Sequence, residues 1–214
     1  MNGHIDHFVL AAPDLARACV QFEADTGVRP VFGGAHPGRG TQNALVAFDA
    51  SSYLEIIAPD PAQPATSMSA PMARLTQPTL LHWAVRCSGA GTVAVRLMAL
   101  GWTPTEVRRM SRTPPGGVRL AWELFGLHRH DYGGLAPFFI DWLDCPHPAT
   151  TSPRVGRLLA VRLTSPEPEP LRALVEEFGV DVDVAAGAAA MTLRFNSPRG
   201  EIRYKGLAPA GFTL

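Results

Sequence analysis

The stretch HFVLAAPDLARACVQFEADTG, residues 7–27, sets the pattern that the rest of the chain repeats. A short β-type run is followed by a Pro-Asp pair, by apolar residues at helical spacing and by Gly27. This order predicts a strand that leads into a capped amphipathic helix. Three further β-type runs, joined by Gly, Asp and Ser turns, follow up to residue 59, so the first unit reads βαβββ.

The same order of elements begins twice more downstream. LLHWAVRCS starts a second unit whose helix ends at Gly101, and LLAVRLTS starts a third whose helix ends at Gly179. We therefore predict an α+β fold of repeated βαβββ units, with two full units and a C-terminal third unit. The predicted units, all within a single domain of residues 1–214, are 5–59, 80–146 and 157–207.

The charge composition argues against nucleic acid and anionic membranes as partners. The 214 residues carry 19 Lys and Arg against 19 Asp and Glu, and the basic residues are scattered. Nucleic acid and anionic membranes are therefore not expected partners. Three separated cysteines are typical of reduced thiols, and no segment has the form of a signal peptide or membrane span, so we expect a cytoplasmic protein.

Two histidines occupy matching places in the first strands of the first two units, His7 in HFVL and His82 in HWAV. If Phe8 and Trp83 pack under their helices, the histidines face the other, open side of the sheet. Each histidine is equally well explained as a polar residue on a half-solvated face. The third unit has Ala160 at the nearest equivalent position, so the scaffold itself does not require a histidine.

A carboxylate stands among apolar residues in YLEII, where Tyr53, Glu55 and Ile57 share one strand face. Burying Glu55 requires a compensating cation, metal or proton, unless it is exposed or paired with an arginine such as Arg39. Two histidines and a carboxylate suit Fe(II), Mn(II), Zn(II), Ni(II) or Co(II). Asp141 is a candidate fourth ligand, although a one-residue change of register would turn it away.

The units, opened by DHFVL…PDL and HWAV and with the first closed by YLEII, resemble the vicinal oxygen chelate superfamily. That superfamily includes glyoxalase I, extradiol dioxygenases and bleomycin-resistance proteins. GGAHPGRGTQNAL (33–45) and FFIDW…HPA are similar to its glyoxalase-like branch. The resemblance implies that the sheets curl into an open cup, and that a divalent metal ion is held by His7, Glu55, His82 and Asp141.

The resemblance also implies a function. We expect a metal-dependent lyase, isomerase or dioxygenase that acts on a small oxygenated metabolite, with Glu55 alternatively acting as a base. Glycines alone explain a hairpin at 33–45, but its polar residues are better explained as substrate contacts, namely His36, Arg39 and Asn43.

Two alternatives to the enzyme stay open. One is a non-catalytic binding or resistance protein that uses the same cup without metal, with Trp83, Trp142 and Phe139 as apolar walls. The other is an interaction module that has lost its site. In each case the chain is expected to be a monomer or a homodimer.

Overall fold

The computed structural model describes residues 3–112 and 119–207 of the chain. Its strands and helices, in chain order, are β1 (His4–Ala11), α1 (Leu15–Thr26), β2 (Val31–His36), β3 (Thr41–Ala47), β4 (Tyr53–Pro59), α2 (Ser69–Met72), β5 (Thr79–Arg86), α3 (Ala90–Ala99), β6 (Thr103–Pro104), β7 (Arg108–Arg112), β8 (Leu120–Phe125), β9 (Leu127–His128), η1 (Gly133–Leu135), β10 (Phe138–Asp141), η2 (Pro148–Thr150), β11 (Leu158–Ser165), α4 (Glu169–Phe178), β12 (Asp183–Ala186), β13 (Ala190–Ser197) and β14 (Gly200–Gly206).

The signals around the first helix act as predicted. The side chain of Asp14 accepts a hydrogen bond from the backbone N–H of Arg17 at 2.9 Å, which caps the first turn of α1. Gly27 ends the helix with a φ of 81°, a left-handed conformation that favours glycine. Helix α1 then packs its buried face, including Leu15 and Phe22, against the sheet.

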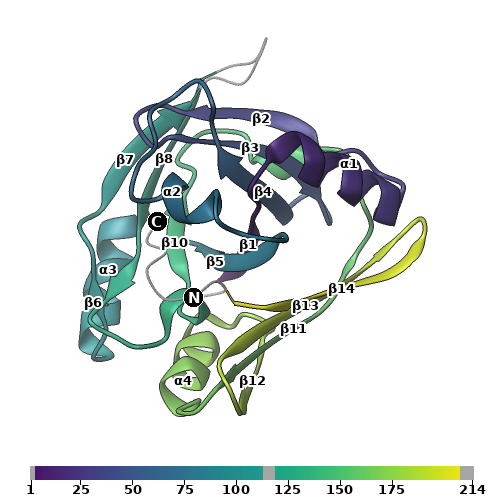
Figure 1. Ribbon diagram of the computed structural model, residues 1–214. Coiled ribbons are helices and arrows are strands. Elements are labelled where there is room, and N and C mark those ends of the chain that lie inside the picture. Colours follow the sequence, from purple (N-terminus) through teal and green to yellow (C-terminus); the bar gives the residue numbers. More distant parts are fainter. Residues whose placement is uncertain (1–2, 113–118, 208–214) are drawn as a thin grey trace.

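Eight strands form one mixed sheet in the order β2-β3-β4-β1-β5-β10-β8-β7. Read outward from the antiparallel junction of β1 with β5, the two halves have the same plan, because β1 pairs in parallel with β4 as β5 does with β10. The sheet curls so far that β7 lies against β2 (Figure 1). The α+β class and the cup of repeated units are thereby confirmed.

The two faces of the sheet pack differently. Phe8 and Trp83 are fully buried in the main core, on the side covered by the helices, as the alternation of the strands predicts. Val9, Ile140 and Trp122 belong to a smaller apolar cluster on the concave side. The concave cluster also receives Met68 and Met72 from the segment around α2.

The third unit has the predicted element order but a different strand pairing. It forms a four-stranded sheet, β12-β11-β13-β14, in which β11 runs parallel to β12, the strand directly after helix α4. In the first two units the parallel partner of the first strand is the last strand. The short link after α4 brings β12 back beside β11, so the third unit builds no second cup. Its apolar residues, including Leu163 and Phe195, join the main core.

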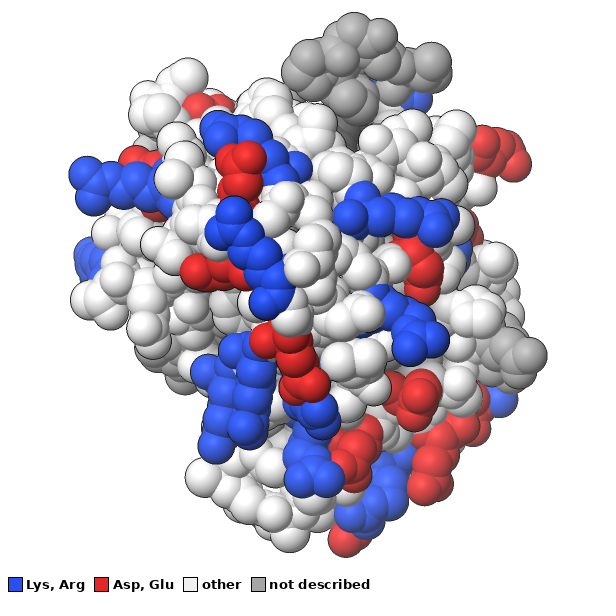
Figure 2. Space-filling model, turned by 90° about the vertical axis from the view of Figure 1, so that its right-hand side faces the viewer, with Lys and Arg blue, Asp and Glu red and all other residues white. Residues whose placement is uncertain are grey.

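Over residues 3–112 and 119–207, no helix combines the length and the apolarity that crossing a membrane requires. On the face seen from the right-hand side of Figure 1, basic and acidic side chains are interspersed (Figure 2). Exposed ion pairs such as Arg162 with Asp183 and Arg194 with Glu201 join opposite charges at the surface.

Candidate functional site

The concave side of the curled sheet holds a cavity of about 90 Å³. Among the described residues, the polar and charged ones that line it come from the first unit, and the second unit supplies apolar side chains to its wall. The polar set is His7, His36, Arg39, Thr41, Asn43, Tyr53 and Glu55, and the second unit contributes Met110, Trp122, Leu124, Phe138, Ile140 and Trp142. The acid–base groups in this cavity therefore come from the first unit.

An irregularity in β1 turns two neighbouring side chains toward the same interior region. Ile5 pairs with Val85 and His7 with Ala84, so Asp6 is the extra residue of a β-bulge. Bulges re-aim side chains that a regular strand would send to opposite faces. As a result Oδ1 of Asp6 lies 2.7 Å from Nδ1 of His7, and both side chains are buried.

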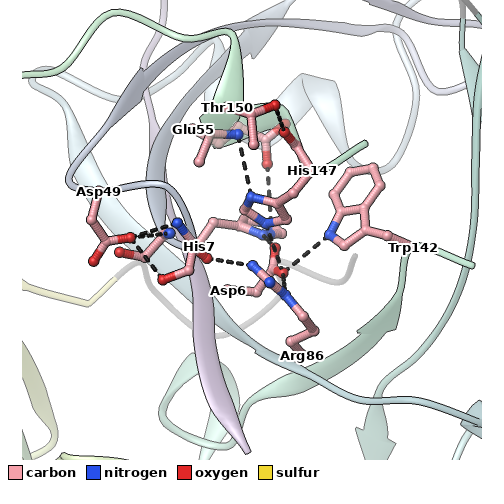
Figure 3. A network of polar contacts seen from close by, with 11 residues as sticks. Asp6, His7, Asp49, Glu55, Arg86, Trp142, His147 and Thr150 are labelled. Carbon is pink, nitrogen blue, oxygen red and sulfur yellow. Dashed lines mark hydrogen bonds and ion pairs between the residues drawn. The ribbon is translucent and has the colours of Figure 1, made fainter. Parts of the chain in front are cut away.

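Asp6 is the centre of a buried polar network (Figure 3). Besides His7, its carboxylate accepts hydrogen bonds at Oδ2 from Nε of Arg86 at 2.9 Å, Nε1 of Trp142 at 3.0 Å and Nε2 of His147 at 3.0 Å. These donors come from β1, β5 and the segment that follows β10. The network therefore ties the two halves of the sheet together behind the cavity.

The network fixes the protonation of Asp6 and the orientation of His7. Burial opposes ionisation of Asp6, but the hydrogen bonds and charges of His147 and His7 outweigh it, and its pKa is held below the ordinary value. A carboxylate only accepts hydrogen bonds, so Nδ1 of His7 carries the proton. Nε2 of His7 is the ring nitrogen on the side of Glu55.

The His7 ring is held on both sides. Tyr53 stacks on it with ring centroids 4.6 Å apart, and Phe138 meets it edge-on at 5.3 Å. Its Nε2 lies 3.7 Å from Oε2 of Glu55. A ring fixed by Asp6, Tyr53 and Phe138 presents one nitrogen to the cavity in a set direction.

Glu55 is 9% exposed and lies on the cavity face of β4 with Tyr53 and Ile57, as predicted. Nδ2 of Asn43 donates to its Oε1 at 2.5 Å, and Nε2 of His36 is 3.8 Å from the same oxygen. The compensation that burial of this carboxylate requires thus comes in part from the β2–β3 hairpin.

The hairpin loop is held in place by the segment that follows β4. The backbone N–H of Gly38 donates to Gln63 at 2.9 Å, and Thr66 donates to the carbonyl oxygen of Arg39 at 2.7 Å. At Gly40, with a φ of 66°, a Cβ would lie 2.7 Å from the carbonyl oxygen of Pro64. The close approach requires glycine, and it positions His36, Arg39 and Asn43 at the cavity.

His82 is on the concave face but does not reach the cavity. It pairs with Val9, and the ring of Phe138 stands edge-on to it at 5.4 Å, as it does to His7. Nδ1 of His82 accepts a hydrogen bond from the backbone N–H of Trp83 at 3.1 Å. Burial lowers the pKa of His82 to about 4, so the ring is neutral at pH 7.

Phe138 also occupies the position in the second unit that corresponds to Glu55 in the first. Val9 pairs with Glu55 in the first unit, and the matching residue Ala84 pairs with Phe138 in the second. Asp141 lies near the end of β10 and accepts hydrogen bonds from the backbone N–H groups of Gly89 at 2.7 Å and Leu143 at 2.9 Å. In the observed register, Asp141 is thus on the face of β10 that points away from the cavity.

Two of the residues expected as apolar walls, Trp83 and Phe139, lie in the main core and not at the cavity. Trp83 lies on the helix side of β5, fully buried, and its Nε1 donates to the carbonyl oxygen of Leu135 at 2.8 Å. Phe139 is also in the main core, because its neighbour Phe138 has the cavity face of β10. Trp142 does line the cavity, as predicted.

The structure thus brings His7, Glu55, His36, Arg39 and Asn43 to one cavity and leaves His82, Asp141 and Trp83 outside it. Within the described ranges, no group of three or more His, Cys, Asp and Glu side chains has an arrangement that could hold a metal ion. Sequence reasoning missed Asp6. The signal was a carboxylate beside His7 in an otherwise apolar strand.

Two βαβββ units joined edge to edge around one cavity define a protein of the vicinal oxygen chelate class. More particularly, the chain belongs to the family of the glyoxalase-like domain, whose model matches residues 5–179. No curated protein matches the chain.

Solved structures are similar to the chain at low sequence identity. A hypothetical protein from Staphylococcus aureus is similar with a TM-score of 0.69 and 14% identity, over 97% of this chain and 99% of that one. Methylmalonyl-CoA epimerase from Mycobacterium tuberculosis has a TM-score of 0.48 and 20% identity, over 65% of this chain and 87% of that one. A hypothetical protein from Bacillus halodurans C-125 has a TM-score of 0.47 and 14% identity, over 68% and 98%.

Proposed function

We propose that the chain is a proton-transfer enzyme, an isomerase or lyase that acts on a small oxygenated metabolite. The observation that carries this proposal is the pair formed by Glu55 and His7. Their side chains face each other across 3.7 Å in an apolar-walled cavity, and Asp6 holds the far side of the imidazole at 2.7 Å. A base and an acid in fixed positions are what removal of a proton beside a carbonyl group needs.

In this reaction Glu55 takes the proton from the carbon next to the substrate carbonyl. The hydrogen bond from Asn43 to Oε1 of Glu55 leaves Oε2 on the side of His7. His7, protonated at Nε2, donates a hydrogen bond to the oxygen on which negative charge develops, and Asp6 stabilises the imidazolium through Nδ1–H. Return of the proton by Glu55 to the neighbouring carbon gives the isomerase outcome, and loss of a leaving group from a carbon next to the deprotonated one gives the lyase outcome.

The resemblance to metal-dependent relatives implies a divalent ion. To bind it, the four predicted ligands would have to lie around one point. They do not fit that role here, because Phe138 stands beside His82 and in the register position of a second acid. The carboxylate of Asp141 accepts backbone hydrogen bonds elsewhere. The proposed chemistry therefore uses only the chain's own groups.

The small cavity limits the substrate. Its volume of about 90 Å³ is below the roughly 150 Å³ of an engineered cavity that admits benzene. A reacting group of a few non-hydrogen atoms fits it.

The proposal is tested by hydrogen exchange into small carbonyl compounds. Wild-type protein is incubated in D₂O with pyruvate, 2-oxobutyrate, lactate and dihydroxyacetone, and loss of C–H signal is followed by proton NMR. We expect exchange in at least one of them, with loss of exchange in Glu55→Gln. Saturable binding of these compounds without any exchange would instead indicate a binding protein.

A further inference from the structure

Two arginines, one from each half of the sheet, lie on its cavity side. Arg39, in the turn between β2 and β3, lines the cavity and is half-buried. Arg108 begins β7 and pairs with Leu124, and it shares a strand face with Met110, two residues on. Leu124 and Met110 both line the cavity, so the Arg108 side chain leaves the strand on the cavity side.

The closure of the sheet brings these arginines together. Strand β2, which leads into the turn with Arg39, contacts strand β7, which begins with Arg108, where the curled sheet meets itself. Burial, and after it the charge of Arg108, lowers the pKa of Arg39. Two cations held near each other repel, and an anion between them relieves this repulsion.

Among the described residues, neither arginine has an acidic partner in an ion pair. In the described part of the chain, no carboxylate forms an ion pair with Arg39 or Arg108, whereas Arg29, Arg162 and Arg194 each have one. An anionic ligand could therefore pair with both without displacing a described carboxylate.

Arg39 is also pre-positioned for binding. Its backbone N–H donates to the carbonyl oxygen of His36 at 3.0 Å, and its own carbonyl accepts from Thr66 at 2.7 Å. Holding the backbone on both sides lowers the entropy lost when the guanidinium binds a ligand.

We propose that Arg39 and Arg108 form a subsite for the carboxylate of the substrate, which makes the substrate a small 2-oxo or 2-hydroxy carboxylic acid. This inference rests on the proposed function. Guanidinium groups match the two oxygens of a carboxylate. Because Arg39 and Glu55 line the same small cavity, a carboxylate at the arginines leaves its neighbouring carbons beside Glu55 and His7. The positive charge also offsets the repulsion between Glu55 and an anionic substrate.

The test measures binding separately from catalysis. Trp122 and Trp142 line the cavity, so quenching of tryptophan fluorescence reports occupancy. The probes are pyruvate, its neutral amide pyruvamide, and inorganic phosphate. The variants are Arg39→Gln and Arg108→Gln, with Arg109→Gln as matched control. Arg109 is on the other face of β7, paired with Glu123, and its replacement changes the net charge equally.

We expect Arg39→Gln and Arg108→Gln each to weaken pyruvate binding about tenfold, as loss of a charge-assisted hydrogen bond does. Pyruvamide binding should stay the same in every variant, and Arg109→Gln should bind pyruvate like the wild type. Pyruvate affinity should also fall as salt rises.

Any of four results would contradict the proposed subsite. Pyruvate affinity could fall equally in all three arginine variants, or pyruvamide could bind as tightly as pyruvate. Phosphate could bind more tightly than pyruvate, or no probe could show saturable binding. Glu55→Gln separates the two proposals, because it should bind pyruvate at least as well as the wild type. If the arginine effects appear while Glu55→Gln retains hydrogen exchange, the proposed function fails and the subsite stands.

Discussion

Nδ1 of His7 lies 2.7 Å from Oδ1 of Asp6, although the two residues are neighbours in a β-strand, where adjacent side chains normally point to opposite faces. The bulge in β1 makes this contact possible. It joins a buried carboxylate to an imidazole whose other nitrogen faces Glu55. The proposed acid–base chemistry depends on that connection.

Asp6→Asn should disrupt the orientation of His7. An amide can present its NH₂ group to Nδ1, which moves the ring proton to Nε2 and removes the charge that stabilises an imidazolium. We expect hydrogen exchange to fall by about tenfold, because Nε2 then donates from a neutral ring and the charge-assisted part of the hydrogen bond is lost. Nitrogen NMR of the His7 ring should show the tautomer change, and an unchanged tautomer would contradict the role of Asp6.

Asn43→Ala should act through Glu55. Loss of the hydrogen bond to Oε1 makes the charged carboxylate less favourable, so the acidic limb of the rate profile should move to higher pH. We expect a fall in exchange rate of about tenfold at neutral pH. Gln42→Ala is the control, because its side chain points to the other face of β3 and donates to Pro59. Equal effects of both changes would mean that the hairpin is only structural.

Treatment with EDTA should leave hydrogen exchange within about twofold of the untreated protein, because the proposed proton transfers need only side chains. The protein is purified without an affinity tag that binds metal, and its metal content is measured in parallel. His82→Ala should bind pyruvate like the wild type, since His82 does not line the cavity. A stoichiometric ion, with activity lost on chelation and restored by that ion, would contradict the metal-free account.

Stability should fall as the pH drops from about 6.5 to about 4, because His82 is neutral in the folded state and protonated in the unfolded chain over that range. The unfolded state binds more protons there, so acid favours unfolding. At about 1.4 kcal/mol for each unit of pKa difference, the loss is at most about 3.5 kcal/mol.

Urea unfolding of wild type and His82→Gln at about pH 7 and about pH 4.5 measures this loss. The carboxyl of Asp6, whose pKa is lowered, loses its contribution only at more acidic pH. His82→Gln should therefore show a much smaller difference between the two pH values. The same difference in both proteins would contradict the assignment to His82.

Much of the fold was predictable because local signals agreed with it. Asp14 and Gly27 mark the ends of a helix, and alternation places Phe8 and Trp83 under the helices. The same alternation gave the cavity face of β4 with Glu55. The third unit repeats the element order, but β11 pairs with β12, and such pairing depends on link lengths and on packing against the rest of the core.

The site was less predictable because it depends on single-residue register. Asp6 reaches His7 only through a bulge, which no pattern in the sequence marks. On β10 a shift of one residue decides that Phe138, and not Phe139 or Asp141, faces the cavity. Nor does the sequence indicate that Asn43 folds onto Glu55, although its polar character in the strand was the clue that it has a partner.

The central claim is that Glu55 is the base, and deuterium exchange into the substrate carbon tests it most directly. Glu55→Gln removes the charge and keeps the shape, and Glu123→Gln is the matched control on the other side of the sheet, in register with Arg109 and Asp141. We expect at least about a hundredfold loss in Glu55→Gln and wild-type exchange in Glu123→Gln. Exchange retained in a folded Glu55→Gln would contradict the account.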